Sequence, residues 1–157
     1  MKKLLLSILP FLHSCVGDTP ENLGVYENKL APCPDCPNCV SSFDTNAPHL
    51  INPIKADLEK IERTLASLNY ANIVDRSDNY IRAEFKSRFM GYVDDVEFLY
   101  DELKILSHVR SASRVGYTDL GANRRRVEKI RSIVEYDSSN EAHSFSCESF
   151  PERGKQF

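Results

Sequence analysis

The sequence lacks tryptophan and has no surplus of positive charge, since 20 Lys and Arg face 23 Asp and Glu, for a net charge of −3. General nucleic-acid binding needs a basic footprint, so this balance argues against that class of function. Beyond its N-terminal segment the sequence also lacks any run of about 18 apolar residues. A membrane-spanning helix in the body of the chain is therefore not expected.

The composition fits a single globular domain. At 157 residues the chain is long enough for one domain but not for two. Hydrophobic residues make up 41% of the sequence, which is too many for an intrinsically disordered chain. A domain of this size buries enough surface to fold without a metal ion or a disulfide.

Residues 1–14 have the features of a lipoprotein signal peptide. Lys2 and Lys3 provide a positive start, and an apolar stretch from Leu4 to Leu12 follows. This stretch is too short to cross a hydrocarbon core of about 30 Å as a helix. A cleaved signal is therefore favoured over a membrane span.

The signal ends in Leu12-His13-Ser14-Cys15, which resembles a bacterial lipobox. In that case the peptide is cut before Cys15, and acyl chains on Cys15 hold the protein on the membrane, which is its predicted partner. Val16, rather than Asp, follows the cysteine. This favours the outer over the inner membrane of the cell envelope, with the domain facing the periplasm. An ordinary cleaved signal with a coincidental cysteine is the alternative.

Residues 15–50 are rich in cysteine and proline and have no sustained periodicity, so we interpret them as an extended arm on the surface of the domain. Cys33, Cys36 and Cys39 lie in this arm, and Cys147 lies near the C-terminus. Four cysteines allow three full pairings, and the sequence does not choose among them. Because thiols outside the cytoplasm tend to be oxidised, we favour a disulfide between Cys33 and Cys39, with a Cys36–Cys147 bridge as a further hypothesis.

A metal or iron–sulfur site is the alternative use of these cysteines, because three cysteines separated by two residues each have ligand-like spacing. The ferredoxin pattern, however, needs a cysteine where Phe43 stands. A zinc site would need Cys147 or His49 as its fourth ligand. We therefore predict no metal and no cofactor.

Residues 51–137 have the periodicities of a folded α-β-β-β(-β)-α domain. A helix is predicted over residues 53–69 with Asn52 as its N-cap, because Pro53 suits the first helical position and apolar residues recur at helical spacing. Alternating apolar and charged residues then predict antiparallel strands with one face exposed to water. The predicted strands cover residues 71–75, 80–89, 92–100 and 103–113, and in the last of them Leu103, Ile105, Ser107 and Val109 share one face.

A second helix follows the strands, because apolar residues recur at helical spacing from Val127 to Val134. It starts either at Asp119, which would place Leu120 on the apolar face, or at Asn123 as the N-cap. Residues 138–157 are polar and are interpreted as a loosely packed tail. The expected fold is a two-layer α+β domain, in which an antiparallel sheet of about four strands carries both helices on one face.

The junction between the last strand and this helix is rich in arginine, with five Arg in residues 110–126. Backbone amides at the start of a helix, together with guanidinium groups, suit a carboxylate or a phosphate. We therefore predict a pocket for a small anionic ligand at this junction. Its candidate residues are Arg110, Ser111, Arg114, Asn123 and Arg124.

The same arginines have a structural alternative, in which they pair with carboxylates and hold the junction together. Positive charge at a helix N-terminus opposes the helix dipole, so these arginines need acidic partners. The available carboxylates belong to Asp94, Asp95, Glu97 and Asp119.

The sequence contains no recognisable combination of catalytic residues. His49, His108 and His143 are scattered, and no serine lies in a G-x-S-x-G motif. This favours a non-catalytic binding or accessory module. The alternatives are a hydrolase or thiol enzyme that uses the Cys39–Ser42 loop with His49, and an envelope scaffold with an exposed apolar patch.

Two motifs resemble a known family. The first comprises Asn22–Val25, Leu30–Cys33, Pro37–Ser42 and His49, and the second is Arg110–Arg124. In this order they resemble the opening and closing signatures of the DUF1499 family, over roughly residues 17–136. The function of that family is unknown, so the resemblance implies no reaction.

The resemblance does bear on individual residues. Cys33 and Cys39 match the pattern of the family while Cys36 departs from it, which implies a Cys33–Cys39 link and argues against a metal site with three cysteines. The other matching positions, whether structural or functional, are Ser41, Ser42, His49, Arg110 and Asn123.

Overall fold

The computed structural model describes residues 17–87 and 90–147 of the chain. The predicted signal peptide and Cys15 lie outside the described residues. So do residues 148–157 of the predicted tail. Within the described part of the chain, no helix is both long and apolar enough to cross a membrane.

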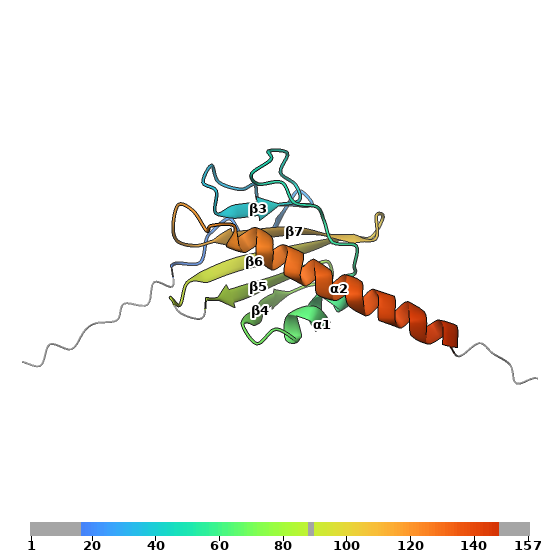
Figure 1. Cartoon of the computed structure of the whole chain (residues 1–157). Coiled ribbons are helices and arrows are strands. Elements are labelled where there is room, and N and C mark those ends of the chain that lie inside the picture. Colours follow the sequence, from blue (N-terminus) through green and yellow to red (C-terminus); the bar gives the residue numbers. More distant parts are fainter. Residues whose placement is uncertain (1–16, 88–89, 148–157) are drawn as a thin grey trace, which may run out of the picture.

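A five-stranded antiparallel sheet forms the centre of the fold (Figure 1). The expected α+β class is confirmed, with five strands rather than about four, because a short segment of the predicted arm pairs with the last strand as an edge strand. In sheet order the strands are β3 (Cys39–Ser41), β7 (Leu106–Ser113), β6 (Val93–Asp101), β5 (Tyr80–Lys86) and β4 (Ala71–Arg76).

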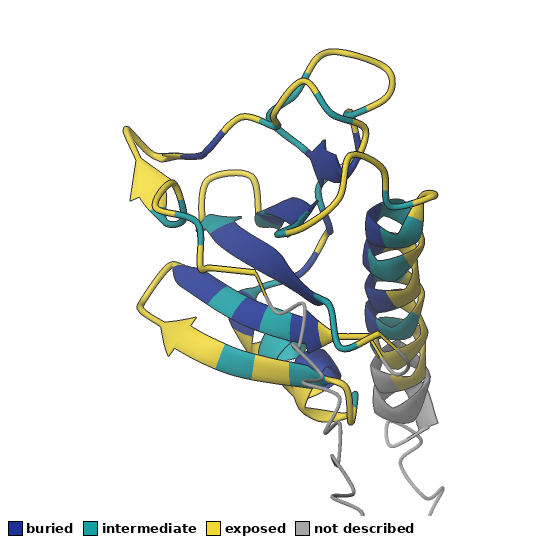
Figure 2. Cartoon of the chain, turned by 90° about the vertical axis from the view of Figure 1, so that its left-hand side faces the viewer, coloured by how far each residue is buried: buried dark blue, intermediate teal, exposed yellow. Residues whose placement is uncertain are grey.

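The main hydrophobic core lies between one face of this sheet and two helices, α1 (Leu58–Ala66) and α2 (Ala122–Cys147). The predicted alternation in β5 is confirmed, since Ile81, Ala83 and Phe85 are all buried in this core. Figure 2 shows that α2 turns its buried side toward the sheet and its exposed side away from it. The helices contribute Leu58, Ile61, Leu65, Val127, Ile130 and Val134.

Helix α1 begins later than predicted, and Asn52 is not its N-cap. Asp57 caps the helix instead, because its carboxylate accepts a hydrogen bond of 2.9 Å from the backbone N–H of Lys60. Ile54 is drawn out of the helix by two backbone hydrogen bonds with Ser107, of 2.8 and 2.9 Å. It remains fully buried, so its apolar character was informative although its predicted conformation was wrong.

Helix α2 starts at neither of the two predicted positions. Its first residue is Ala122, and the Asp119 carboxylate accepts hydrogen bonds from the backbone N–H groups of Gly121 and Asn123. Leu120 is exposed rather than part of the apolar face. The helix runs on to Cys147, so the predicted loose tail does not begin at residue 138.

The second sheet face was predicted to be exposed to water, and for the central strands this is wrong. The arm folds into a hairpin of β1 (Val25–Tyr26) and β2 (Lys29–Leu30). Leu30 from the hairpin packs with Tyr80 and Leu99 of the sheet in a second, smaller core. The arm is therefore an integral layer of the domain, and it removes polar groups of β6 and β7 from water.

The strand β7 is shorter than predicted. Leu103 and Ile105 are exposed in the turn before it, whereas Ser107 and Val109 are buried as expected. The Asp101 carboxylate fixes this turn by accepting hydrogen bonds of 3.1 Å from the backbone N–H groups of Leu103 and Lys104. The turn residues cannot continue the ladder because they reverse the chain.

The disulfide between Cys33 and Cys39 is present, with a Cα–Cα distance of 5.6 Å. It fixes the proline-rich turn directly before β3. Cys36 is a free, half-buried thiol, so the hypothetical Cys36–Cys147 bridge is not formed. Among the described residues, no three His, Cys, Asp or Glu side chains gather into a metal site.

Candidate functional site

The five residues predicted to bind an anion do not converge on one pocket. Arg110 and Arg114 belong to the sheet side that faces the arm, whereas Ser111 faces the helices and contacts Asn123. Arg124 points elsewhere again, and its guanidinium donates hydrogen bonds to the carbonyl groups of Pro48 (3.2 Å) and Leu50 (2.7 Å). Each residue has a partner within the protein that gives it a structural role.

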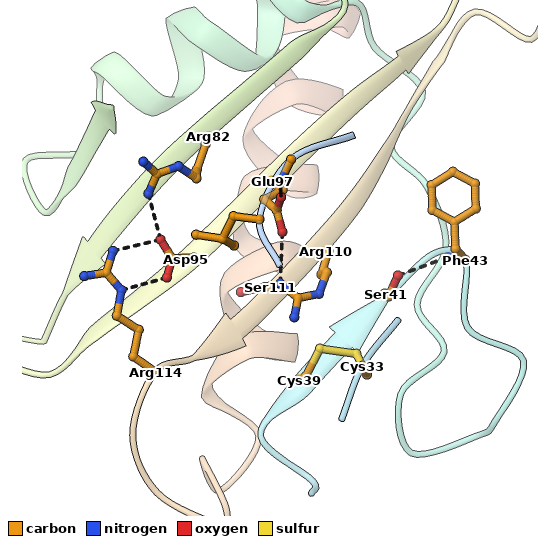
Figure 3. A network of polar contacts seen from close by, with 12 residues as sticks. Cys33, Cys39, Ser41, Phe43, Arg82, Asp95, Glu97, Arg110, Ser111 and Arg114 are labelled. Carbon is orange, nitrogen blue, oxygen red and sulfur yellow. Dashed lines mark hydrogen bonds and ion pairs between the residues drawn. A yellow bond between two sulfur atoms is a disulfide. The ribbon is translucent and has the colours of Figure 1, made fainter. Parts of the chain in front are cut away.

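Arg114 is held by acidic residues of the neighbouring strands (Figure 3). Its Nε donates to Asp95 Oδ2 at 2.7 Å, and its Nη2 contacts Glu84. Arg82 binds the other oxygen of Asp95 at 3.1 Å. The hydrogen bond to Asp95, followed by that to Glu84, raises the pKa of Arg114 above its usual range, so the guanidinium is permanently charged.

Glu97 is the most enclosed charged residue of this face. It is fully buried, and its carboxylate accepts hydrogen bonds from Arg110 Nη1 (2.9 Å), Tyr80 Oη (2.8 Å) and the backbone N–H of Gly24 (2.7 Å). Burial, and then the charge of Glu97, raise the pKa of the Tyr80 phenol well above its usual range, so Tyr80 stays a donor. The structural alternative for the arginines is therefore confirmed for Arg110 and Arg114.

Asn123 is the corresponding hub on the helix side of the sheet, and it is completely buried. Its Oδ1 accepts a hydrogen bond of 2.6 Å from Ser111 Oγ. Its Nδ2 donates to the carbonyl of Asn38 at 2.8 Å and to Ser113 Oγ at 2.9 Å. Arg126 also contacts Asn123 and forms an ion pair with Asp94. This cluster joins the start of α2 to β7 and to the residue before β3.

The predicted combination of His49 with the Cys39–Ser42 loop is not assembled for catalysis. His49 Nδ1 lies 3.0 Å from the backbone carbonyl of Cys39, and the sulfur of Cys39 is in the disulfide. The Oγ of Ser41 accepts a hydrogen bond from the backbone N–H of Phe43. These contacts shape the loop and leave no free thiol within it.

Ser42 instead meets His108, a pairing that the sequence did not indicate because it depends on the register of β3 and β7. Ser42 Oγ lies 3.1 Å from His108 Nδ1 and accepts a hydrogen bond of 2.9 Å from the backbone N–H of Val109. Phe43 stacks on the imidazole, with ring centroids 4.1 Å apart. Because the Ser42 hydroxyl completes the strand pairing, the arrangement is structural.

Protonation of His108 should weaken the fold. Burial, followed by the charge of Lys104, lowers the pKa of His108 below its usual value near 6.5. The unfolded chain then binds the proton more readily, so the contribution of His108 to stability falls as the pH drops below about 6.5 and is constant above it. Urea unfolding of the wild type and His108→Gln across this range should show a steeper acid loss for the wild type. Parallel pH profiles would contradict the assignment.

A cleft of about 1020 Å³ opens between the end of β5, the connection from α1 to β4 and the first turns of α2. Tyr70 and Phe85 form its aromatic part, with centroids 5.9 Å apart in an edge-to-face arrangement. Its volume is at the upper end of the range of small-molecule sites. Four cationic side chains line it, and no described lining residue is acidic. The four are Lys86, Arg125, Arg126 and Lys129.

These cations differ in how they are held. Arg126 lies over the Phe85 ring at 5.0 Å and is bound by Asp94, and Arg125 donates to the carbonyl of Leu120 at 2.7 Å. The ammonium groups of Lys86 and Lys129 have no hydrogen-bond or ion-pair partner in the described part of the chain. They are the charges available to a ligand.

None of the five residues predicted to bind an anion lines this cleft. Arg125 and Arg126 belong to the same Arg-rich segment, but neither they nor Lys86, Lys129 and Tyr70 are among those candidates. Helical spacing offered one signal, because Lys129 follows Arg125 and Arg126 by one turn of α2. Lys86 could be added only once the end of β5 was known to lie beside that helix.

Comparison with known proteins supports one family. A family model described as "Protein of unknown function (DUF1499)" matches residues 29–134, which contain β3–β7, α1 and the first turns of α2. No curated protein and no solved structure matches the chain.

Proposed function

Since the chain belongs to the DUF1499 family, a family of unknown function, we propose its role from the geometry of the molecule: a non-catalytic binding module for an anionic ligand. The site is the cleft between β5 and α2. One observation carries this proposal, namely that four cations and no described acidic residue line a cleft of about 1020 Å³. Two of them, Lys86 and Lys129, have charges that nothing described neutralises.

The ligand chemistry follows from the lining. Ammonium and guanidinium groups bind phosphate or carboxylate oxygens through charge-assisted hydrogen bonds. The exposed part of Tyr70 offers an apolar surface beside them. A ligand that joins an anionic group to an apolar or aromatic part therefore fits better than a bare ion.

The location of the protein is part of the same proposal. The positive start, the short apolar stretch and Cys15 support a lipoprotein of the bacterial cell envelope, held by acyl chains and facing the periplasm. The residue after Cys15 favours the outer membrane. In this setting the cleft would serve as an accessory site close to a membrane.

Phenyl phosphate and inorganic phosphate test the binding proposal by isothermal titration calorimetry on the full chain. We expect phenyl phosphate to bind more tightly, and added salt to weaken both ligands through screening. Lys86→Glu and Lys129→Glu should each weaken phenyl phosphate at least tenfold, about 1.4 kcal/mol. Lys55→Glu, at an exposed position outside the cleft, is the matched control. Equal affinities for all four proteins would refute the proposal.

A further inference from the structure

The described chain enters the domain beside the loop that connects β7 to α2, residues 114–121. A Cβ placed on Gly17 would lie 2.7 Å from Cγ2 of Val115 and 3.0 Å from Cβ of Arg114. Cys15 precedes Gly17 by two residues, which span at most about 7 Å. Acyl chains on Cys15 would therefore bring a bilayer surface next to this loop.

The same loop exposes large apolar side chains. Val115 is 42% exposed, Tyr117 74% and Leu120 83%. A backbone hydrogen bond of 3.4 Å from Arg114 to Val93 holds the loop at the end of the sheet where β6 starts. The only described carboxylate in the loop, that of Asp119, is turned inward to cap α2. In Figure 1 this loop and the N-terminal end of the described chain lie at the same end of the molecule.

The cationic cleft opens at this end as well. Ala71, the first residue of β4, pairs with Phe85 near the end of β5, so Tyr70 and Lys86 lie at the end of the sheet from which the loop projects. Arg125 and Lys129 follow the loop directly, on the first turns of α2. Apolar side chains and uncompensated positive charge thus occur together, as in surfaces that bind anionic membranes.

We propose that the end of the domain formed by the β7–α2 loop docks on a lipid bilayer. Val115, Tyr117 and Leu120 enter the membrane interface, where aromatic side chains are favoured. The cleft then faces the headgroups, and Lys86 and Lys129 bind the phosphates of anionic lipids. This inference rests on the lipid anchorage and on the anion-binding cleft of the proposed function, and it names the membrane itself as the source of the ligand.

The absence of tryptophan permits a direct test. Tyr117→Trp places a single tryptophan on the docking loop, and in a second variant Leu103→Trp places one on the exposed turn at the opposite end of the sheet. Each full chain is studied on vesicles of phosphatidylcholine with phosphatidylglycerol, and on phosphatidylcholine alone. We expect the tryptophan at position 117 to shift its emission to shorter wavelength and to be quenched by brominated lipids, most strongly with phosphatidylglycerol. The tryptophan at position 103 should change in neither respect.

Two further measurements separate the docking proposal from the function on which it rests. Intact mass shows whether Cys15 is acylated, and the same fluorescence experiment on Cys15→Ser tests docking without an anchor. Val115→Ser with Leu120→Asn should weaken vesicle binding of the Cys15→Ser chain at least tenfold while leaving phenyl phosphate binding unchanged.

The outcomes then differ. If Cys15 is acylated but the emission of the tryptophan at position 117 does not shift, the docking proposal is overturned and the proposal of a lipoprotein still holds. If the emission at position 117 shifts but Cys15 is not acylated, the docking proposal is supported and the proposal of a lipid anchor is overturned. Equal shifts at positions 103 and 117 overturn the orientation. An emission shift of the tryptophan at position 117 that occurs in native membranes but not in protein-free vesicles would assign the loop to a protein partner. This result would overturn the proposal.

Discussion

Replacing Glu97 by alanine is expected to destabilise the domain by about 3–5 kcal/mol, because the change leaves the buried guanidinium of Arg110 without its counter-charge. The side chains of Glu97 and Arg110 are 0% and 4% exposed, so water cannot take over the lost interaction. Arg110 Nε already lacks a partner in the described structure. Tyr80 and the backbone N–H of Gly24 also lose their acceptor, which loosens the arm. Urea unfolding followed by circular dichroism measures the change.

An exposed ion pair supplies the matched control. Glu62 and Arg76 are 3.1 Å apart, with side chains 45% and 37% exposed. Glu62→Ala is therefore expected to change stability by less than about 1 kcal/mol. The double variant Glu97→Met with Arg110→Met removes both buried charges and should recover most of the stability lost in Glu97→Ala. A loss in Glu97→Ala no larger than that in Glu62→Ala would show that the pair is not buried as described.

Asn123→Ala is expected to cost about 3 kcal/mol, because one truncation leaves several buried polar groups without a partner. The carbonyl of Asn38 loses its hydrogen bond from Asn123, and the hydroxyl of Ser111 loses its acceptor. For a domain of this size such a loss lowers the melting temperature by roughly 10 °C. Differential scanning calorimetry measures it.

Asn72, exposed on the edge strand β4, provides the comparison for Asn123. Asn72→Ala should remain within about 0.5 kcal/mol of the wild type, as is usual for surface positions. Asn123→Leu tests whether volume matters, since an apolar side chain of similar size fills the space and still leaves the polar groups unpaired. Stability of Asn123→Ala equal to that of Asn72→Ala would contradict the role of Asn123 as a hub.

The periodicity of apolar residues was sufficient to predict a helix or strand where one of its faces packs against the core. The alternation from Tyr80 to Lys86 follows directly from the core on one side of the sheet, and the spacing of Val127, Ile130 and Val134 reflects the buried stripe of α2. The arginine-rich segment also identified the chain region that starts α2. Each of these patterns is imposed by neighbours close in sequence or by one large apolar surface.

Local sequence patterns did not predict where the helices begin or that the polar face of the sheet is buried. Asn52 and Pro53 are a strong helix-start signal, yet the backbone of Ile54 is paired with Ser107 of another strand. In the sequence, Asp95 and Glu97 are typical of a sheet face exposed to water. In the structure both are buried, because the arm covers this face. The charges on that face balance one another across three strands, and sequence order does not show which of them meet.

The candidate site also was predictable from the sequence only in part. The sequence predicts Arg110 and Asn123 as ligand contacts, with pairing to carboxylates as the alternative for the arginines, and in the structure both residues are internal supports. The uncompensated charges come from Lys86 and Lys129, which are brought together only by the packing of α2 across the sheet. A ligand site formed by two distant segments leaves little trace in either segment alone.

The edge strand β3 has a consequence for how the chain acquires its structure during synthesis. Cys33 and Cys39 are separated by only six positions, so their turn can close as soon as both cysteines have emerged in an oxidising environment. Strand β3, in contrast, pairs with β7, and most of the domain is made between them. Such distant pairings form slowly. We therefore expect the disulfide to form early. Strand β3, which begins at Cys39, should be among the last strands to pair.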